Sequence, residues 1–175
     1  MKNYFKVFIV FYLICVTGFG CATLKAPVMD DGNKIPVSIL IYRGDPDSMG
    51  KKQYKFRNEV GEYMENHIIS IFNRAGYDAK LIRKPDEFTP GKNKYLININ
   101  ITSYNPGSTA ARMLVGFGAG ATSLDIQYNL LCESEKPLLD TKDGVGSSRS
   151  WQVCVIKLNE NILKNVTNKI NEVLK

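Results

Sequence analysis

The pattern of apolar and polar residues after position 36 predicts about five β-strands. Residues 37–42 are almost continuously apolar, as expected of a strand that is buried on both faces. In residues 95–102 and 122–132 apolar and polar side chains alternate, which is typical of a strand with one face in the core. Residues 77–83 and 138–145 are the other predicted strands, and the second of these is short.

Two longer segments have the spacing of amphipathic helices. Between residues 51 and 75 apolar positions recur at steps of three and four, and Gly76 follows as a C-terminal cap. A second helix begins after Ser150, which is placed to cap it. Its apolar stripe consists of Trp151, Val155, Leu158, Ile162, Val166, Ile170 and Val173. The order β-α-β-β-β-β-α predicts an α+β two-layer sandwich, in which a mixed sheet carries both helices.

The first twenty residues have the composition of a secretory signal peptide. Lys2 and Lys6 make the start basic, residues 7–16 are all apolar, and small residues precede Cys21. Ten apolar residues span about 15 Å as a helix, which is half the hydrocarbon thickness of a bilayer. We therefore interpret residues 1–20 as a cleaved signal rather than a permanent transmembrane anchor.

The residues around the predicted cleavage point indicate a lipid attachment site. The sequence GFGC at residues 18–21 resembles a bacterial lipobox, in which cleavage exposes a cysteine that receives acyl chains. Because each buried methylene contributes ~0.8 kcal/mol, two or more chains would hold a soluble domain on a membrane. An ordinary signal peptide with an incidental cysteine is the alternative. We predict a lipidated Cys21, a tether over residues 21–34 and a single domain over residues 35–175.

Composition and charge indicate an ordinary globular domain. The 175 residues are 44% hydrophobic and 23% charged, which excludes a disordered, collagenous or coiled-coil chain. Removal of Lys2 and Lys6 from the 23 basic residues leaves 21 against 17 acidic ones, a net charge of +4. This mild excess suits a position beside anionic lipid or cell wall and is no evidence for nucleic-acid binding. Because glutamates alternate with the basic cluster at residues 51–57, we interpret it as a solvated helix face.

The stretch from residue 95 to residue 131 resembles a known family. It contains a strand, the sequence SYNPGS at residues 103–108, the sequence RMLVGFGAG at residues 112–120, and a second strand. In these features it is similar to bacterial envelope lipoproteins of domain-of-unknown-function family 4410, which implies no enzyme activity and no catalytic residues. The order of elements is also similar to the small αβ domain of the curli-secretion lipoprotein and of lipoprotein activators of penicillin-binding proteins. That second likeness concerns the fold, and fold does not dictate function.

Residues 103–120 form a long connection between two predicted strands. Structureless connections beyond about 15 residues are uncommon in compact domains, and this one is small and apolar with a single charge, Arg112. One interpretation is a glycine-bearing extension or bulge of the strands. The other is a contact surface for a partner or for lipid headgroups, comprising Arg112, Gly116, Phe117, Gly118 and Gly120. Since Ala121 and a strand follow these glycines, they do not form a dinucleotide-binding fingerprint, and we expect no nucleotide.

Few other residues carry chemistry. Cys132 and Cys154 would remain in the mature chain, and in an oxidising compartment a disulfide between them would add ~3 kcal/mol to stability. Two buried free thiols are the alternative. His67 is the single histidine, and we interpret it as a partly buried core residue because a histidine-built metal site needs a second one. No metal or other cofactor is predicted.

These features favour a non-enzymatic lipoprotein. We predict a binding, assembly or accessory module of the bacterial cell envelope, held by acyl chains on Cys21 at the periplasmic face of the outer membrane. Its partner would be an envelope protein or a glycan, not a nucleic acid. The alternatives are a small periplasmic cell-wall hydrolase using paired carboxylates and a ring-forming secretion subunit. For the latter, residues 103–120 are short, because a membrane-spanning hairpin needs two strands of about ten residues and a turn.

Overall fold

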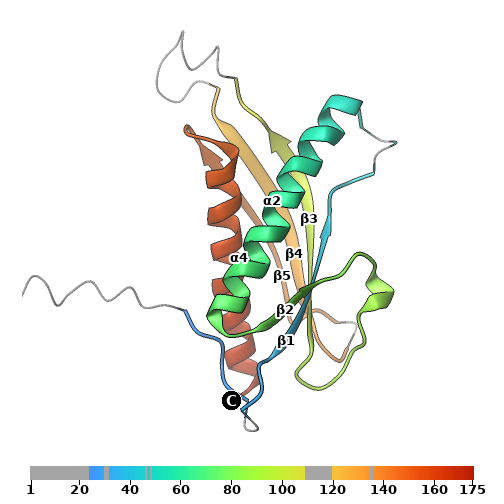
Figure 1. Cartoon of the computed structure of the whole chain (residues 1–175), viewed down its shortest axis with the longest axis vertical. Helices are drawn as coiled ribbons and strands as arrows, with labels where there is room; N and C mark the ends of the chain where they lie inside the picture. Colours follow the sequence, from blue (N-terminus) through green and yellow to red (C-terminus); the bar gives the residue numbers. More distant parts are fainter. Residues whose placement is uncertain (1–23, 30–31, 46, 48, 109–119, 135) are drawn as a thin grey trace, which may run out of the picture.

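The computed structural model describes residues 24–29, 32–45, 47, 49–108, 120–134 and 136–175. These residues form five strands, two long helices and one short 3-10 helix (Figure 1). In chain order the elements are β1 (Pro36–Tyr42), α2 (Lys51–Ala75), β2 (Asp78–Leu81), η2 (Pro85–Glu87), β3 (Tyr95–Asn105), β4 (Thr122–Leu131), β5 (Leu139–Ser147) and α4 (Trp151–Val173). Neither long helix of this described part has an apolar stretch that could cross a bilayer.

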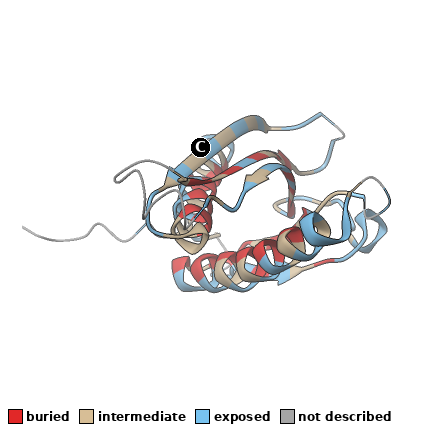
Figure 2. Ribbon diagram, turned by 90° about the horizontal axis from the view of Figure 1, so that it is seen from above, coloured by how far each residue is buried: buried red, intermediate tan, exposed pale blue. Residues whose placement is uncertain are grey.

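The strands form one mixed sheet in the order β2-β1-β3-β4-β5. β1 is parallel to both β2 and β3, whereas β4 is antiparallel to β3 and to β5. Helix α2 connects β1 to β2, because parallel neighbours cannot be joined by a tight turn. Both long helices pack against each other and cover the same face of the sheet (Figures 1 and 2). The predicted α+β two-layer sandwich is therefore confirmed.

The core lies between the sheet and the two helices. Alternate residues of β3 and β4 are directed toward the helices and are buried, which the alternation in the sequence predicts. The apolar stripes of α2 and α4 close this core with Val60, Met64, Ile68, Phe72, Val155, Leu158, Ile162, Val166 and Ile170. Complete burial of one such side chain contributes about 2 kcal/mol.

The bounds of the strands differ from their predicted ranges by up to three residues, and β5, predicted as short, has nine residues. β2 has four residues, because the N–H of Tyr77 is used by the helix cap, where it donates to the carbonyl of Phe72. β3 continues past residue 102 to Asn105, since its pairing with β4 resumes after a register shift between Ile101 and Ser103. The connection after β3 therefore begins later than the sequence predicts.

The segment before β1 packs partly on the domain. The N–H of Ala26 donates a hydrogen bond of 2.7 Å to the carbonyl of Ala75, the last residue of α2. Ala26 and Met29 also pack against the core, so part of the stretch predicted as a tether touches the domain. The buried core residues of the described chain run from Ile35 to Ile170. A chain that begins at Ala22 thus retains the whole described fold.

Candidate functional sites

Hydrogen bonds close the base of the connection between β3 and β4, for which the sequence left open a strand extension or a contact surface. The two strands pair as far as Asn105. Beyond this pair the N–H of Ser108 donates to the carbonyl of Gly120 at 3.0 Å, and the hydroxyl of Thr122 donates to the carbonyl of Pro106 at 3.2 Å. These bonds hold the two sides of the connection together, and we call this end of the domain the hairpin end.

Two glycines shape this base. Gly107 has φ +72°, and a Cβ there would collide with the carbonyl oxygen of Gly120, so only glycine fits. Gly120 itself has φ +66° and is the one member of the predicted contact surface that the structure describes. The others, Arg112, Gly116, Phe117 and Gly118, lie outside the described residues, as does Cys21.

A cluster of charged side chains lies where β1 and β2 end, and the sequence reasoning missed it. The Glu65 side chain of α2 is only 6% exposed and accepts hydrogen bonds from Arg43 at 2.6 Å and Arg83 at 2.8 Å. Arg43 directly follows β1, and Arg83 lies just beyond β2. The shared carboxylate therefore ties α2 to the ends of both parallel strands. The Oε1 of Glu65 accepts hydrogen bonds from two guanidinium groups. The cluster therefore stabilises this end of the sheet and does not present this oxygen to a substrate.

One signal for this cluster is present in the sequence. Gly61 lies inside α2, where a glycine is unfavourable by about 1 kcal/mol relative to alanine. A Cβ at this position would collide with the side chain of Arg43. Because Gly61 has no side chain, Arg43 has room to cross the helix and reach Glu65.

Arg57 is buried, so the prediction that residues 51–57 form a solvated face is wrong for this residue. It is 8% exposed and donates from Nη1 to the carbonyl of Ile101 at 2.8 Å and from Nη2 to that of Thr102 at 3.1 Å. These carbonyls lie at the register shift of β3. A bulge interrupts the ladder and leaves backbone groups unpaired, and Arg57 supplies their partners.

The sheet face opposite the helices carries amides. Asn98 in β3 lies opposite Asn129 in β4 and donates to its Oδ1 at 3.1 Å. The next such pair is Asn100 and Gln127, and Gln127 also donates to Asp140 of β5 at 3.2 Å. This face therefore presents neutral donors and acceptors side by side.

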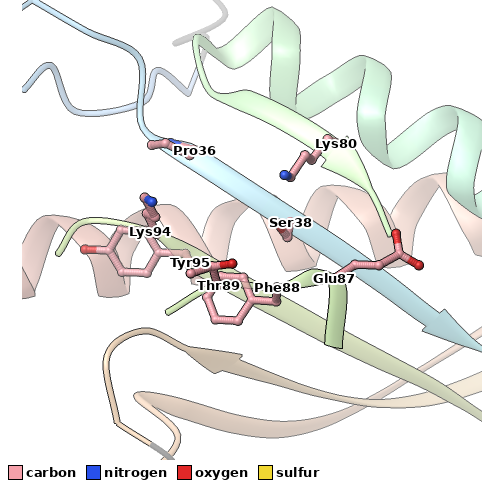
Figure 3. Close-up of a pocket in the computed structure, with 8 residues that line it drawn as sticks. All are labelled: Pro36, Ser38, Lys80, Glu87, Phe88, Thr89, Lys94 and Tyr95. Carbon is pink, nitrogen blue, oxygen red and sulfur yellow. The ribbon is translucent and has the colours of Figure 1, made fainter. Parts of the chain in front are cut away.

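The segment between β2 and β3 lies against another part of this face and encloses a pocket (Figure 3). Its volume is 190 Å³. The lining comes from β1, β2, the segment after η2 and the start of β3, and consists of Pro36, Ser38, Lys80, Glu87, Phe88, Thr89, Lys94 and Tyr95. Sequence reasoning did not identify this site, because its residues are scattered over three strands and a loop.

The two cysteines are free thiols and lie at opposite ends of β4. The Sγ of Cys154 is 3.8 Å from the carbonyl of Thr122, where β4 begins. Cys132 follows the last residue of β4, and the ten-residue strand between the two ends spans about 30 Å. A disulfide needs Cα atoms about 6 Å apart. The structure therefore favours two separate thiols over the bridge, and burial raises the pKa of both, which makes them less reactive.

His67 is half-buried between the two helices. Its ring stacks on that of Tyr63 at a centroid distance of 6.4 Å, and its Nδ1 lies 3.1 Å from Nδ2 of the buried Asn159. Burial lowers the pKa of His67, so the neutral ring is favoured. Within the described residues no group of three or more metal-ligating side chains surrounds it or any other position.

The chain belongs to the family DUF4410, a domain of unknown function, whose model matches residues 23–148. The match covers the five strands and α2 and ends before α4. The resemblance seen in residues 95–131 is thus confirmed. No curated protein matches the chain in sequence.

Two solved structures are similar in their general fold. A PelC variant from Paraburkholderia phytofirmans, a dodecamer, aligns at 14% identity with a TM-score of 0.46, over 79% of this chain and 91% of its own. A neuraminyllactose-binding hemagglutinin homologue from Helicobacter pylori aligns at 10% identity with a TM-score of 0.32, over 83% of this chain and 86% of its own. Because both TM-scores are below 0.5, these alignments support no conclusion about the role of this chain.

Proposed function

We propose that this chain is a lipid-anchored accessory module of the bacterial cell envelope, whose hairpin end contacts a protein or glycan partner. One observation carries the proposal, namely that the described residues that border the two segments concerned lie at opposite ends of the domain. The N-terminal segment enters where Ala26 bonds to Ala75, and we call this the tether end. The strands β3 and β4 meet their connection at the other end (Figure 1).

An acyl group on Cys21 would hold the tether end close to a membrane. Between Cys21 and Ala26 the fully extended chain spans at most about 17 Å. β3 runs 11 residues away from this end, which corresponds to about 36 Å. The predicted contact surface around Arg112 and Phe117 would therefore project away from the anchoring membrane, toward a partner.

The amide-bearing sheet face supports the same proposal. Asn100, Gln127 and Asn129 offer both donors and acceptors without net charge. Glycans and peptide backbones present matching neutral groups. A module fixed at one end would expose this face along its side, where such a chain could lie across it.

The anchor is tested by comparing the wild type with Cys21→Ser in membrane fractions and by intact mass. We expect the wild type in the membrane fraction with acyl mass on Cys21, and the variant in the soluble fraction or with an unprocessed signal. If both proteins are soluble at the same processed mass, the anchor is wrong.

The partner contact is tested by photo-cross-linking from position 110 in cells. We expect a discrete cross-linked product that disappears in the double variant Arg112→Glu, Phe117→Ser, while the domain remains folded by circular dichroism. Lys142→Glu, which makes the same charge change on β5, is the matched control and should keep the product. Unchanged cross-linking in the double variant would contradict the proposed contact.

A further inference from the structure

The pocket between β1, β2 and the segment after η2 has a buried polar floor. Ser38 is 5% exposed, and its cross-strand neighbour in β2 is Lys80. Figure 3 shows both side chains among those that line the pocket, together with Phe88 and Thr89. A pocket of 190 Å³ has room for a group of a few heavy atoms and for no large ligand.

The hydroxyl of Ser38 has no hydrogen-bond partner among the described residues. Its neighbours in β1, Val37 and Ile39, are fully buried apolar residues. Because successive residues of a strand point to opposite faces of the sheet, these two side chains enter the core, whereas Ser38 faces the pocket on the other side. Its hydroxyl can therefore donate a hydrogen bond to a group that enters the pocket.

The charges around this hydroxyl are mainly positive. Within the described part of the chain, neither Lys80 nor Lys94 forms an ion pair. The one acidic residue of the lining is Glu87. Its Oε1 already accepts the N–H groups of Arg83 at 3.2 Å and Lys84 at 3.0 Å, which fixes the carboxylate at the start of the segment. Two ammonium groups and a hydroxyl thus remain for a ligand.

We propose that this pocket binds a phosphate group, held by the ammonium groups of Lys80 and Lys94 and by the hydroxyl of Ser38. Phosphate oxygens accept several hydrogen bonds at once, and hydrogen bonds to charged groups are about twice as strong as neutral ones. The group is either free phosphate or the headgroup phosphate of an anionic lipid. The site involves no residue of the predicted anchor or contact surface, so it stands independently of the proposed function.

The test is a titration of the ¹⁵N-labelled chain beginning at Ala22 with inorganic phosphate, at constant ionic strength set by chloride. We expect saturable shifts of the amide signals of Ser38, Lys80 and Thr89. In Ser38→Ala and in the double variant Lys80→Gln, Lys94→Gln the affinity should fall at least about tenfold. Lys142→Gln on β5 is the matched control and should bind as the wild type does.

A second titration with dihexanoyl phosphatidylglycerol below its micellar concentration separates the two sources. Tighter binding of the lipid than of inorganic phosphate, lost in the same variants, identifies a headgroup site. Equal binding identifies a site for free phosphate. The proposal is overturned if neither probe gives saturable shifts at the pocket, or if the double variant binds like the wild type. Because Cys21 is absent from the tested chain, the result does not depend on the anchor.

Discussion

Different kinds of buried polar group stabilise the two ends of the sheet. At the hairpin end the carboxylate of Glu65 is buried and shared by Arg43 and Arg83, and Thr122 adds a buried neutral hydroxyl. Arg57 is nearby and satisfies two carbonyls of β3. At the tether end the buried polar groups are neutral and include Tyr77 and Tyr95. Removal of one buried polar group should therefore change the free energy of unfolding by a different amount at each end.

The tyrosines differ in how they are satisfied. The hydroxyl of Tyr77 donates to Oγ1 of Thr167 in α4 at 3.0 Å. The hydroxyl of Tyr95 is buried and has no partner among the described residues. A buried ion must be paired, whereas a neutral hydroxyl without a partner is tolerated at a smaller cost. Substitutions of the charged groups at the hairpin end should therefore lower the free energy of unfolding more than substitutions of the tyrosines at the tether end.

The largest effect is expected at Glu65. Glu65→Gln leaves the buried side of the Arg43 and Arg83 guanidinium groups without a charged partner, and loss of one partner from a buried pair typically removes 3–5 kcal/mol. Because Arg83 is 64% exposed, we expect a smaller loss of about 3 kcal/mol in the free energy of unfolding, measured in urea.

Glu62→Gln is the matched control for this change. Its side chain is 69% exposed and lies 3.8 Å from Arg43, and such surface pairs contribute less than about 1 kcal/mol. Equal losses of unfolding free energy in Glu65→Gln and Glu62→Gln would mean that the buried carboxylate does not stabilise the hairpin end.

The charged end also shows where sequence reasoning reaches its limit. Periodicity predicts α2, β3 and β4 because each needs only neighbouring residues, and Gly76 marks the end of α2 because its φ of +105° requires glycine. Glu65 is 22 positions from Arg43 and 18 from Arg83. These residues meet only after β1, α2 and β2 have folded together, so the glycine at position 61 is a local sign of the cluster but does not reveal which residues form it.

The sequence does not reveal the phosphate pocket either, and a second reason adds to the one just given. Ser38 lies within an apolar run that the sequence identifies as a buried strand, and nothing local shows that its hydroxyl faces a cavity. Lys80 lies in the predicted strand 77–83 and Lys94 in the connection that follows it, and neither pattern indicates a binding site. The pocket exists because β2 pairs with β1 and the chain then returns along the amide-bearing face to β3.

At the tether end, the next largest effect is a loss of stability at alkaline pH. Burial, with smaller contributions from Cys132, Tyr77 and Glu133, raises the pKa of Tyr95 from 10.0 to about 12. The folded state therefore keeps this phenol neutral, and its contribution is complete below pH 10 and is lost as the pH rises toward 12. At pH 11 we expect Tyr95 to account for a loss of about 1.4 kcal/mol.

This loss is measured as the difference between wild type and Tyr95→Phe in urea unfolding at pH 9 and pH 11. The wild type should lose more stability than the variant over this interval. Absorbance of tyrosinate in the folded wild type gives an independent reading of the ionisation. Parallel stability profiles of the two proteins would contradict the burial of a neutral phenol at this end.

The smallest effect separates the two tyrosines at neutral pH. Tyr77→Phe leaves the hydroxyl of Thr167 without its hydrogen bond, and we expect a loss of about 1 kcal/mol in the free energy of unfolding. Tyr95→Phe removes a hydroxyl that has no partner in the described chain, so its stability should equal or exceed that of the wild type. Urea unfolding at pH 7 distinguishes the two variants. A loss of about 1 kcal/mol in both would mean that Tyr95 has a partner, such as a bound water, and that both tyrosines close the tether end in the same way.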